Sequence, residues 1–289
     1  MTLGADRASL AICVISVHIL DMNAQGKLLL LAQLCLSLRR VMRFVRFFNW
    51  GGGYAEFVAV EEFRVLPIPS GVSLVDAAAL PLASQLTVYA LSMLTNATAG
   101  KRVLMHGAAS GIGTIALQYA KHVGCQVFAV SEKEEELHLC KKLGAEVCIN
   151  YKEQDFCKRA KAETGEKGVD IILDLSGRDH FQKNLDCLAT GGSLVIFGQK
   201  LGSRVNVDLS VIVEKDINVV GGDLHNRGLL AYEETKLHLL DVVAKIWPLI
   251  EAGHIQPIIG KIFSFSEAGE AHRALEKCSI PGKLLLVPG

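Results

Sequence analysis

The sequence predicts an α/β fold built on a doubly wound parallel sheet, and three observations lead to that prediction. Residues 101–121 run from a short apolar segment through a turn of small residues into a segment with helical apolar spacing. Beyond them, short runs rich in Val and Ile alternate with helical patterns as far as residue 221. The chain of 289 residues is 50% hydrophobic and 21% charged, which suits one large or two modest domains with a sizeable core.

The alternating region is expected to hold six strands. They are short and apolar, as strands are when helices cover both faces of a parallel sheet. We expect strands at 102–106, 126–130, 147–149, 169–174, 193–197 and 217–221, and helices at 112–123, 133–143, 153–163 and 179–188. This order of elements is that of a dinucleotide-binding Rossmann sheet.

The segments on either side are expected to form a smaller unit. Ser73 is expected to cap a helix through residues 76–80, which Pro81 interrupts before a helix over 82–94. Residues 65–71 form a turn-rich connector. A long helix is predicted near 230–252, and the tail after it is predicted as a strand at 261–265, a helix at 267–278 and a strand at 283–287. This tail has no place in a six-stranded Rossmann sheet, so we expect it to return to the smaller unit.

Composition excludes several classes of function. Formal net charge is zero, with 30 basic and 30 acidic residues, so neither nucleic acid nor a membrane is expected as a partner. The eight cysteines form no Cys-x-x-Cys pair, so we expect no metal and a reducing, cytoplasmic compartment. The apolar run at 8–20 resembles a signal peptide core, but Asp6 cancels Arg7 and no clean cleavage site follows.

Residues 1–50 differ from the rest. They contain two apolar blocks, followed by four arginines among apolar residues at 39–48. Two interpretations of 39–48 stay open: a basic amphipathic helix on a membrane surface, or a segment that is poorly ordered or covered by a partner. We favour the second, because only two turns of helix carry the pattern.

The turn at residues 107–113 favours a bound dinucleotide. A helix that starts directly after a small-residue turn presents free N–H groups to a pyrophosphate. After the second strand, Ser131 and Lys133 suit a ribose 2′-phosphate, whereas the neighbouring Glu132 suits a 2′-hydroxyl. NADP is therefore expected, with NAD possible. Ser176 and Gly177, and Phe197 and Gly198, follow later strands at the edge along which a dinucleotide runs.

A short-chain dehydrogenase is a weaker alternative. Gly107, Gly111 and Gly113 fit the glycine pattern of that family, and Tyr232 and Lys236 form a Tyr-x-x-x-Lys pair. A nearby ammonium lowers the pKa of a phenol, which suits general acid chemistry. However, about 100 residues precede the glycine strand, and no serine lies about a dozen residues before Tyr232. We therefore predict that Tyr232 and Lys236 are surface residues of the long helix.

From residue 51 onward the chain resembles the zinc-free, zeta-crystallin-like quinone oxidoreductases of the medium-chain dehydrogenase/reductase superfamily. The stretches that carry the resemblance are 53–60 (Gly-Tyr-Ala-Glu-Phe-Val-Ala-Val), 77–81 (Ala-Ala-Ala-Leu-Pro), 108–113, 142–145, 149–151, 168–174, 197–198 and 282–288. The resemblance implies a Rossmann domain at 87–253 and a remnant, partly β, GroES-like catalytic domain at 51–86 and 254–289, after an atypical segment at 1–50.

The resemblance also implies where a cofactor binds. Ser110, Gly111, Ile112 and Gly113 would cradle the pyrophosphate. Ser131, Lys133 and Tyr151 would lie near the adenosine ribose and its 2′-phosphate. Thr87, Phe197 and Gly198 would face the nicotinamide, with Leu224 in the loop over the cofactor. Glu136 stands where the family carries a ribose-phosphate lysine.

The implied activity is hydride transfer from NAD(P)H to a quinone or enone. No catalytic side chain is predicted, because a quinone accepts hydride and water can supply the proton. The Asn-Arg-x-Asp and Gly-x-Glu-x-x-Gly segments of the family are missing from residues 1–50. We expect the substrate pocket to lack a wall and the rate to suffer. A non-catalytic nucleotide-binding or oligomer-partner protein is the alternative. A homodimer is expected through the edge strand between Ile217 and Gly221.

Overall fold

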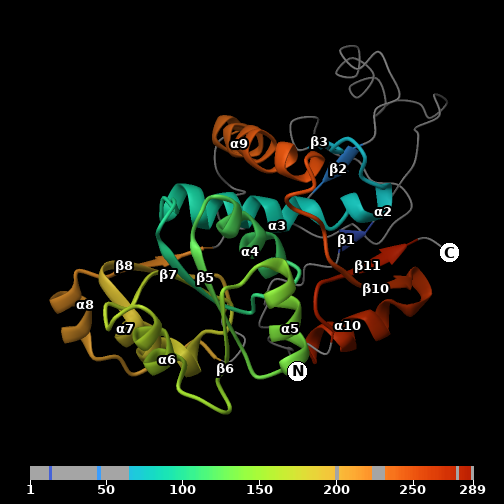
Figure 1. Ribbon diagram of the computed structural model, residues 1–289. Helices are drawn as coiled ribbons and strands as arrows, with labels where there is room; N and C mark the ends of the chain where they lie inside the picture. Colours follow the sequence, from blue (N-terminus) through green and yellow to red (C-terminus); the bar gives the residue numbers. More distant parts are fainter. Residues whose placement is uncertain are drawn as a thin grey trace, which may run out of the picture.

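Residues 13–14, 44–46, 65–198, 202–222, 232–277 and 280–287 are described by the computed structural model. Its main sheet has six parallel strands in the order β6-β5-β4-β7-β8-β9 (Figure 1). The strands are β4 (Arg102–His106), β5 (Gln126–Ser131), β6 (Val147–Asn150), β7 (Val169–Asp174), β8 (Leu188–Ile196) and β9 (Asn218–Gly221). The chain winds outward from β4 in one direction and from β7 in the other, so the prediction of a doubly wound sheet is confirmed.

Helices cover both faces of this sheet (Figure 1). One face carries α3 (Leu80–Thr87), α4 (Gly113–His122), α5 (Glu134–Leu143) and α9 (Tyr232–Glu251), and the other carries α6 (Phe156–Glu163), α7 (Phe181–Cys187) and α8 (Leu209–Lys215). Side chains alternate between the two cores, since Val103 and Met105 enter the first and Leu104 enters the second. The two-sided burial explains why these strands are apolar throughout.

Two elements on the β8 side differ from the prediction. Strand β8 begins at Leu188 and ends at Ile196, so Phe197 lies in the loop beyond it. Helix α8 was not predicted, because its β-branched residues favour a strand. Its end groups explain the helix: Asp208 accepts a hydrogen bond from Ser210 N at 3.0 Å, and Asp216 adopts a left-handed conformation at the C-cap.

The helical segment before β4 starts as predicted but divides differently. Ser73 caps α2 (Leu74–Ala77), accepting from Asp76 N at 3.0 Å, which confirms the predicted cap. Pro81 does not interrupt a helix; it lies in the first turn of α3, where proline costs no hydrogen bond. After Thr87 the chain continues as a π-helix, η3 (Val88–Leu94).

The tail joins the N-terminal part of the chain. Strands β10 (Ile259–Ser264) and β1 (Cys13–Val14) pair in parallel with opposite edges of β11 (Lys283–Val287), while α10 (Ala268–Glu276) packs on β10 and β11. Leu285 of β11 packs against Ala78 and Ala79 beside α2. The tail strands therefore join segments that precede the six-stranded sheet in the sequence.

A short antiparallel pair of strands precedes α2. Strand β2 (Phe44–Arg46) pairs antiparallel with β3 (Val65–Pro67). The alternative of a basic amphipathic helix is wrong for Phe44–Arg46, and the rest of residues 39–48 lies outside the described part. Val65–Pro67 is likewise a strand, where a connector was predicted. Within the described ranges, no helix has the length and apolarity needed to cross a bilayer.

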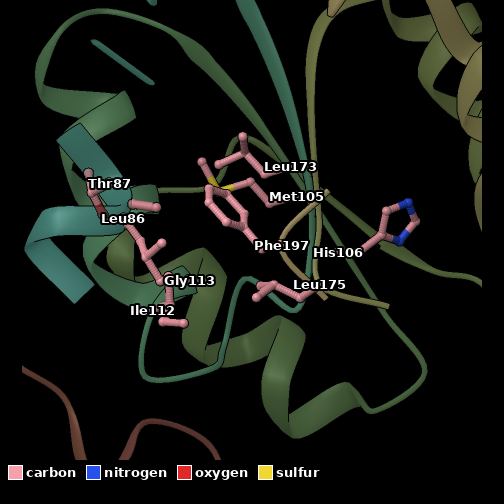
Figure 2. A pocket seen from close by; sticks show the side chains of 10 residues that line it. Leu86, Thr87, Met105, His106, Ile112, Gly113, Leu173, Leu175 and Phe197 are labelled. Carbon is pink, nitrogen blue, oxygen red and sulfur yellow. The ribbon is translucent and has the colours of Figure 1, made fainter. Parts of the chain in front are cut away.

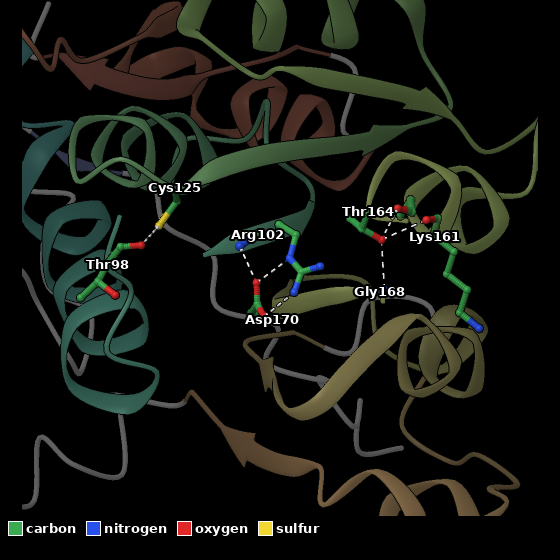
Figure 3. A network of polar contacts seen from close by, with 8 residues as sticks. Thr98, Arg102, Cys125, Lys161, Thr164, Gly168 and Asp170 are labelled. Atoms are coloured by element: carbon green, nitrogen blue, oxygen red, sulfur yellow. Dashed lines mark hydrogen bonds and ion pairs between the residues drawn. The ribbon is translucent and has the colours of Figure 1, made fainter. Parts of the chain in front are cut away.

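The amino ends of the central strands are held by an ion pair. Asp170 of β7 accepts three hydrogen bonds from Arg102 of β4, from its backbone N at 2.7 Å, Nε at 2.8 Å and Nη2 at 2.8 Å (Figure 3). Burial alone would raise the pKa of Asp170, but the bonds from Arg102 outweigh burial and lower it. This edge of the sheet is thus fixed by side chains, far from the carboxyl edge where ligands bind in such folds.

Candidate cofactor site

The glycine turn connects β4 to α4 through residues 107–112. Gly107 has a φ of +75°, which favours glycine, and its carbonyl accepts a hydrogen bond from Ser110 N at 3.0 Å. The Ser110 hydroxyl accepts from Gly113 N at 3.0 Å, and its carbonyl accepts from Thr114 N at 2.9 Å. Ser110 thus fixes the first turn of α4, whose N-terminal end favours an anion.

Two glycines of the turn lie in close packing, and Gly113 is required by it. A Cβ on Gly113 would lie 2.2 Å from the carbonyl oxygen of Gly107, so only glycine lets α4 pack this close to the strand. A Cβ on Gly111 would lie 2.6 Å from Cδ of Lys283, a buried residue at the start of β11. Gly282 N also donates to Ala109 O at 2.7 Å. The tail therefore closes one side of the turn.

An apolar pocket lies between the turn, α3 and the ends of β7 and β8 (Figure 2). It is lined by Leu86, Thr87, Met105, His106, Ile112, Gly113, Ala116, Leu173, Leu175 and Phe197. The Thr87 hydroxyl is buried and has no hydrogen-bond partner among the described residues. Buried polar groups are nearly always paired, so a ligand group that donates or accepts here would complete the site.

The predicted residues after β5 and β6 come together at one edge of this site. Ser131 ends β5, and its Oγ donates to Glu136 Oε2 at 2.6 Å. Lys133 Nζ pairs with Glu136 Oε1 at 3.1 Å. Tyr151 follows β6. Its hydroxyl donates a hydrogen bond to the Glu132 carboxylate, which lowers the pKa of Glu132. Burial, and then Glu132, raises the pKa of Tyr151 to about 12, so Tyr151 is a neutral donor.

A buried polar network supports the loop after β7. Asp174 accepts from Ser176 N at 2.7 Å, Gly177 N at 3.1 Å and Asn184 Nδ2 at 3.0 Å. The Asn184 carbonyl oxygen lies 2.8 Å from His106 Nε2. Because the amide nitrogen of Asn184 donates to Asp174, its oxygen accepts, and His106 carries its proton on Nε2.

His106 is the last residue of β4 and stacks on His180 at 4.8 Å, with an interplanar angle of 7°. Burial lowers the pKa of both imidazoles to about 4, so both rings are neutral at pH 7. In Figure 2 the ring of His106 points away from the pocket, whereas that of Phe197 points into it. His106 is thus a structural support of the turn.

Most predicted site residues lie along one edge of the sheet. The order across the sheet is β6, β5, β4, β7 and β8, and a predicted site residue follows the carboxyl end of each strand. In that order they are Tyr151, Ser131, the turn at 110–113, Ser176 and Phe197. Thr87 joins them from α3. Gly198 packs tightly, since a Cβ there would lie 2.4 Å from Leu175 O. Leu224 lies outside the described residues, as does the side chain of Tyr232; Lys236 is exposed on α9.

Sequence reasoning missed the Asp174–Asn184–His106 network and the contact of Lys283 with Gly111. An aspartate at a strand end is a detectable signal, but its partner Asn184 is not, because only the fold brings α7 beneath the turn. The described ranges contain no cluster of three or more His, Cys, Asp or Glu residues arranged to hold a metal ion.

A doubly wound sheet with a close-packed glycine turn at its switch point defines a dinucleotide-binding fold. Residues 111–241 match the family model described as zinc-binding dehydrogenase. The quinone oxidoreductase of Pseudomonas aeruginosa is 30% identical over 239 residues, which cover 82% of this chain and 72% of that protein.

Solved structures agree with the sequence comparison. A quinone oxidoreductase from Pseudomonas syringae has a TM-score of 0.76 at 26% identity, covering 84% of this chain and 74% of the other. The Escherichia coli quinone oxidoreductase in complex with NADPH has a TM-score of 0.74 at 29% identity, covering 82% and 72%. The chain therefore belongs to the zeta-crystallin-like quinone oxidoreductases of the medium-chain dehydrogenase/reductase superfamily, an enzyme family of oxidoreductases.

Proposed function

We propose that the protein transfers hydride from a nicotinamide cofactor to a small quinone or enone. The observation that carries the proposal is the close-packed glycine turn that joins β4 to the start of α4. Beside it, the Thr87 hydroxyl is buried without a described partner. A nicotinamide carboxamide would supply that partner while its ring lies against the apolar Phe197 and Ile112. NADPH and NADH are the two candidate cofactors, and NADPH is the one bound in the solved Escherichia coli relative.

The proposed roles follow the edge of the sheet. Gly111, Ile112 and Gly113 would meet the pyrophosphate with backbone N–H groups at the start of α4, with Ser110 holding that turn. Ser131, Lys133 and Tyr151 would face the adenosine ribose, Ser176 would line the path between the two ends, and Gly198 and Leu224 would complete the nicotinamide side. The nicotinamide supplies the hydride when bound. The residues described here orient it and exclude water, and no side chain is required to titrate.

The division of labour in the chain is also a proposal. Residues 87–253 would bind the dinucleotide, and 51–86 with 254–289 would form the GroES-like catalytic unit beyond the atypical segment 1–50. Because residues 1–50 lack two motifs of the family, we infer a slow turnover with an incompletely enclosed substrate. Five free cysteines in the described part, Cys125, Cys140, Cys148, Cys157 and Cys187, support a cytoplasmic location.

A homodimer through strand β9 completes the proposal. This strand lies at the edge of the sheet with Val219 40% exposed, and the neighbouring α8 carries Leu209 and Val213, which are 67% and 80% exposed. An edge strand flanked by exposed apolar side chains suits pairing across a twofold axis. Sedimentation velocity should give a dimer that Val213→Asp dissociates; a wild-type monomer would refute this part.

One assay tests the activity. Purified protein is mixed with NADPH or NADH and an ortho-quinone or a simple enone, and nicotinamide absorbance is followed. We expect slow, protein-dependent oxidation. Measurable cofactor binding without any oxidation would favour the alternative of a non-catalytic nucleotide-binding or oligomer-partner protein.

A further inference from the structure

The ribose edge of the site contains a carboxylate in an unusual position. Glu136 lies in the first turn of α5 and engages two groups at once, the Ser131 hydroxyl at 2.6 Å and the Lys133 ammonium at 3.1 Å. Its side chain is only 18% exposed and that of Lys133 is 31% exposed. A hydroxyl and an ammonium that converge can together bind a phosphate. In this structure the Glu136 carboxylate occupies the position between them.

The neighbouring cations are engaged in the same way. Lys152 Nζ lies 3.5 Å from Glu132 Oε2, and Glu132 also bonds to Tyr151. On the loop after β7, Arg178 pairs with Asp179 at 2.7 Å. Lys133, Lys152 and Arg178 therefore each already face a carboxylate.

The local charge balance is negative. Close to this point the chain carries Glu132, Glu134 and Glu136 against Lys133 and Lys152, one more carboxylate than ammonium groups. A ribose 2′-phosphate would bring close to two further negative charges, as phosphate monoesters do near pH 7. A ribose 2′-hydroxyl would instead donate to a carboxylate, the arrangement by which acidic side chains after the second strand select NAD.

We propose that Glu136 is the specificity-determining residue of the cofactor site: it holds Ser131 and Lys133 in the place of a 2′-phosphate, so that the protein binds NADH at least as tightly as NADPH. This inference rests on the proposed function, since it concerns the same dinucleotide. NADPH binds only after its phosphate displaces Glu136 from both partners, whereas NADH leaves the three residues as they are and adds a hydrogen bond to the carboxylate.

The test is the ratio of dissociation constants for NADPH and NADH, measured by calorimetry on the full chain, with 2′,5′-ADP and 5′-AMP as probes that lack nicotinamide. We expect a ratio of one or more for the wild type. Glu136→Lys removes the competing carboxylate and adds a cation, so the ratio should fall at least about tenfold, mostly through tighter NADPH binding. Glu136→Gln keeps the size of the side chain and should lower the ratio by about threefold.

Glu135→Lys is the matched control, because Glu135 is exposed one residue away and the charge change is identical. It should change the ratio by less than about twofold, since screened surface charges interact weakly. A wild type that prefers NADPH tenfold, or a ratio that neither Glu136 variant alters, overturns the role of Glu136 alone. A wild type that binds neither cofactor overturns the proposed function as well.

Discussion

The glycine turn and the ribose edge lie next to each other at the carboxyl ends of β4 and β5, yet they are constructed in opposite ways. The turn is built from backbone, with Gly113 so close to Gly107 that no side chain fits. The ribose edge is built from long charged side chains that pair with one another through Glu136. The two regions therefore differ in the substitutions they accept. Backbone packing at Gly113 leaves no room for another residue, whereas ion pairs near the surface, such as that of Glu136, can be exchanged.

Gly113→Ala is expected to break the turn with the largest effect. Its Cβ would meet backbone atoms of Gly107 and Ala108 at 2.2 and 2.7 Å, which forces the turn apart. Overpacking of this kind costs about 3 kcal/mol, which the free protein relieves by opening the turn. Because a bound pyrophosphate requires the closed turn, affinity should fall by up to about 100-fold, for NADH and NADPH alike. The ratio measured for Glu136 should therefore stay constant.

The control is Gly269→Ala in α10, where a Cβ has no neighbour closer than 3.5 Å. Calorimetric titration should find its cofactor affinity unchanged. Equal losses in the two variants would mean that the turn is not the binding element.

His106→Gln is expected to remove a pH dependence beneath the turn. Burial lowers the pKa of His106 from 6.5 to about 4, so the unfolded chain takes up the proton first as pH falls. The contribution of the neutral His106 ring to the free energy of unfolding is therefore fully present above pH 6.5. It is lost as the pH falls toward 4, in total about 3 kcal/mol. Urea unfolding between pH 7 and 4 should show a smaller acid loss for His106→Gln than for the exposed control His138→Gln. Parallel curves would contradict the assignment.

Asp170→Asn is expected to separate stability from binding. It removes the carboxylate that Arg102 engages at the amino edge of the sheet, and breaking such a charged, partly buried pair should lower the free energy of unfolding by about 2 kcal/mol. Because the pKa of Asp170 is lowered in the folded state, the stability it provides is present above its unfolded pKa and lost in acid. Chemical denaturation should detect the loss, while cofactor affinity stays at the wild-type value. A matching fall in affinity would show that the two edges are coupled.

Thr87→Val is expected to have the smallest effect and to act on the pocket alone. Removing a buried hydroxyl without a described partner should leave the free energy of unfolding unchanged or raise it by up to about 1 kcal/mol. Affinity for either cofactor should fall by about tenfold, the value of one good hydrogen bond. Ser84→Ala, at another buried hydroxyl on α3 without a described partner, is the control; it should leave the free energy of unfolding unchanged or slightly raised, and cofactor affinity unchanged. A Thr87→Val protein with full affinity would place the nicotinamide elsewhere.

The same contrast explains what the sequence could predict. The strands at 102–106 and 169–174 were predicted to the residue, because apolar runs between turn signals determine buried strands. Helix α8 was missed because its β-branched residues favour a strand locally, and the caps at Asp208 and Asp216 outweigh them. The glycine turn was recognisable because backbone geometry dictates residue type. The Glu136 contact was not, since it depends on side-chain rotamers that spacing does not specify.

The most direct test of the site is a crystal structure of the protein grown with NADPH, and a second with NADH. The account predicts the pyrophosphate against the backbone of residues 111–113, the nicotinamide beside Thr87 and Phe197, and Glu136 displaced from Ser131 only in the NADPH complex. A dinucleotide bound away from the glycine turn would contradict it.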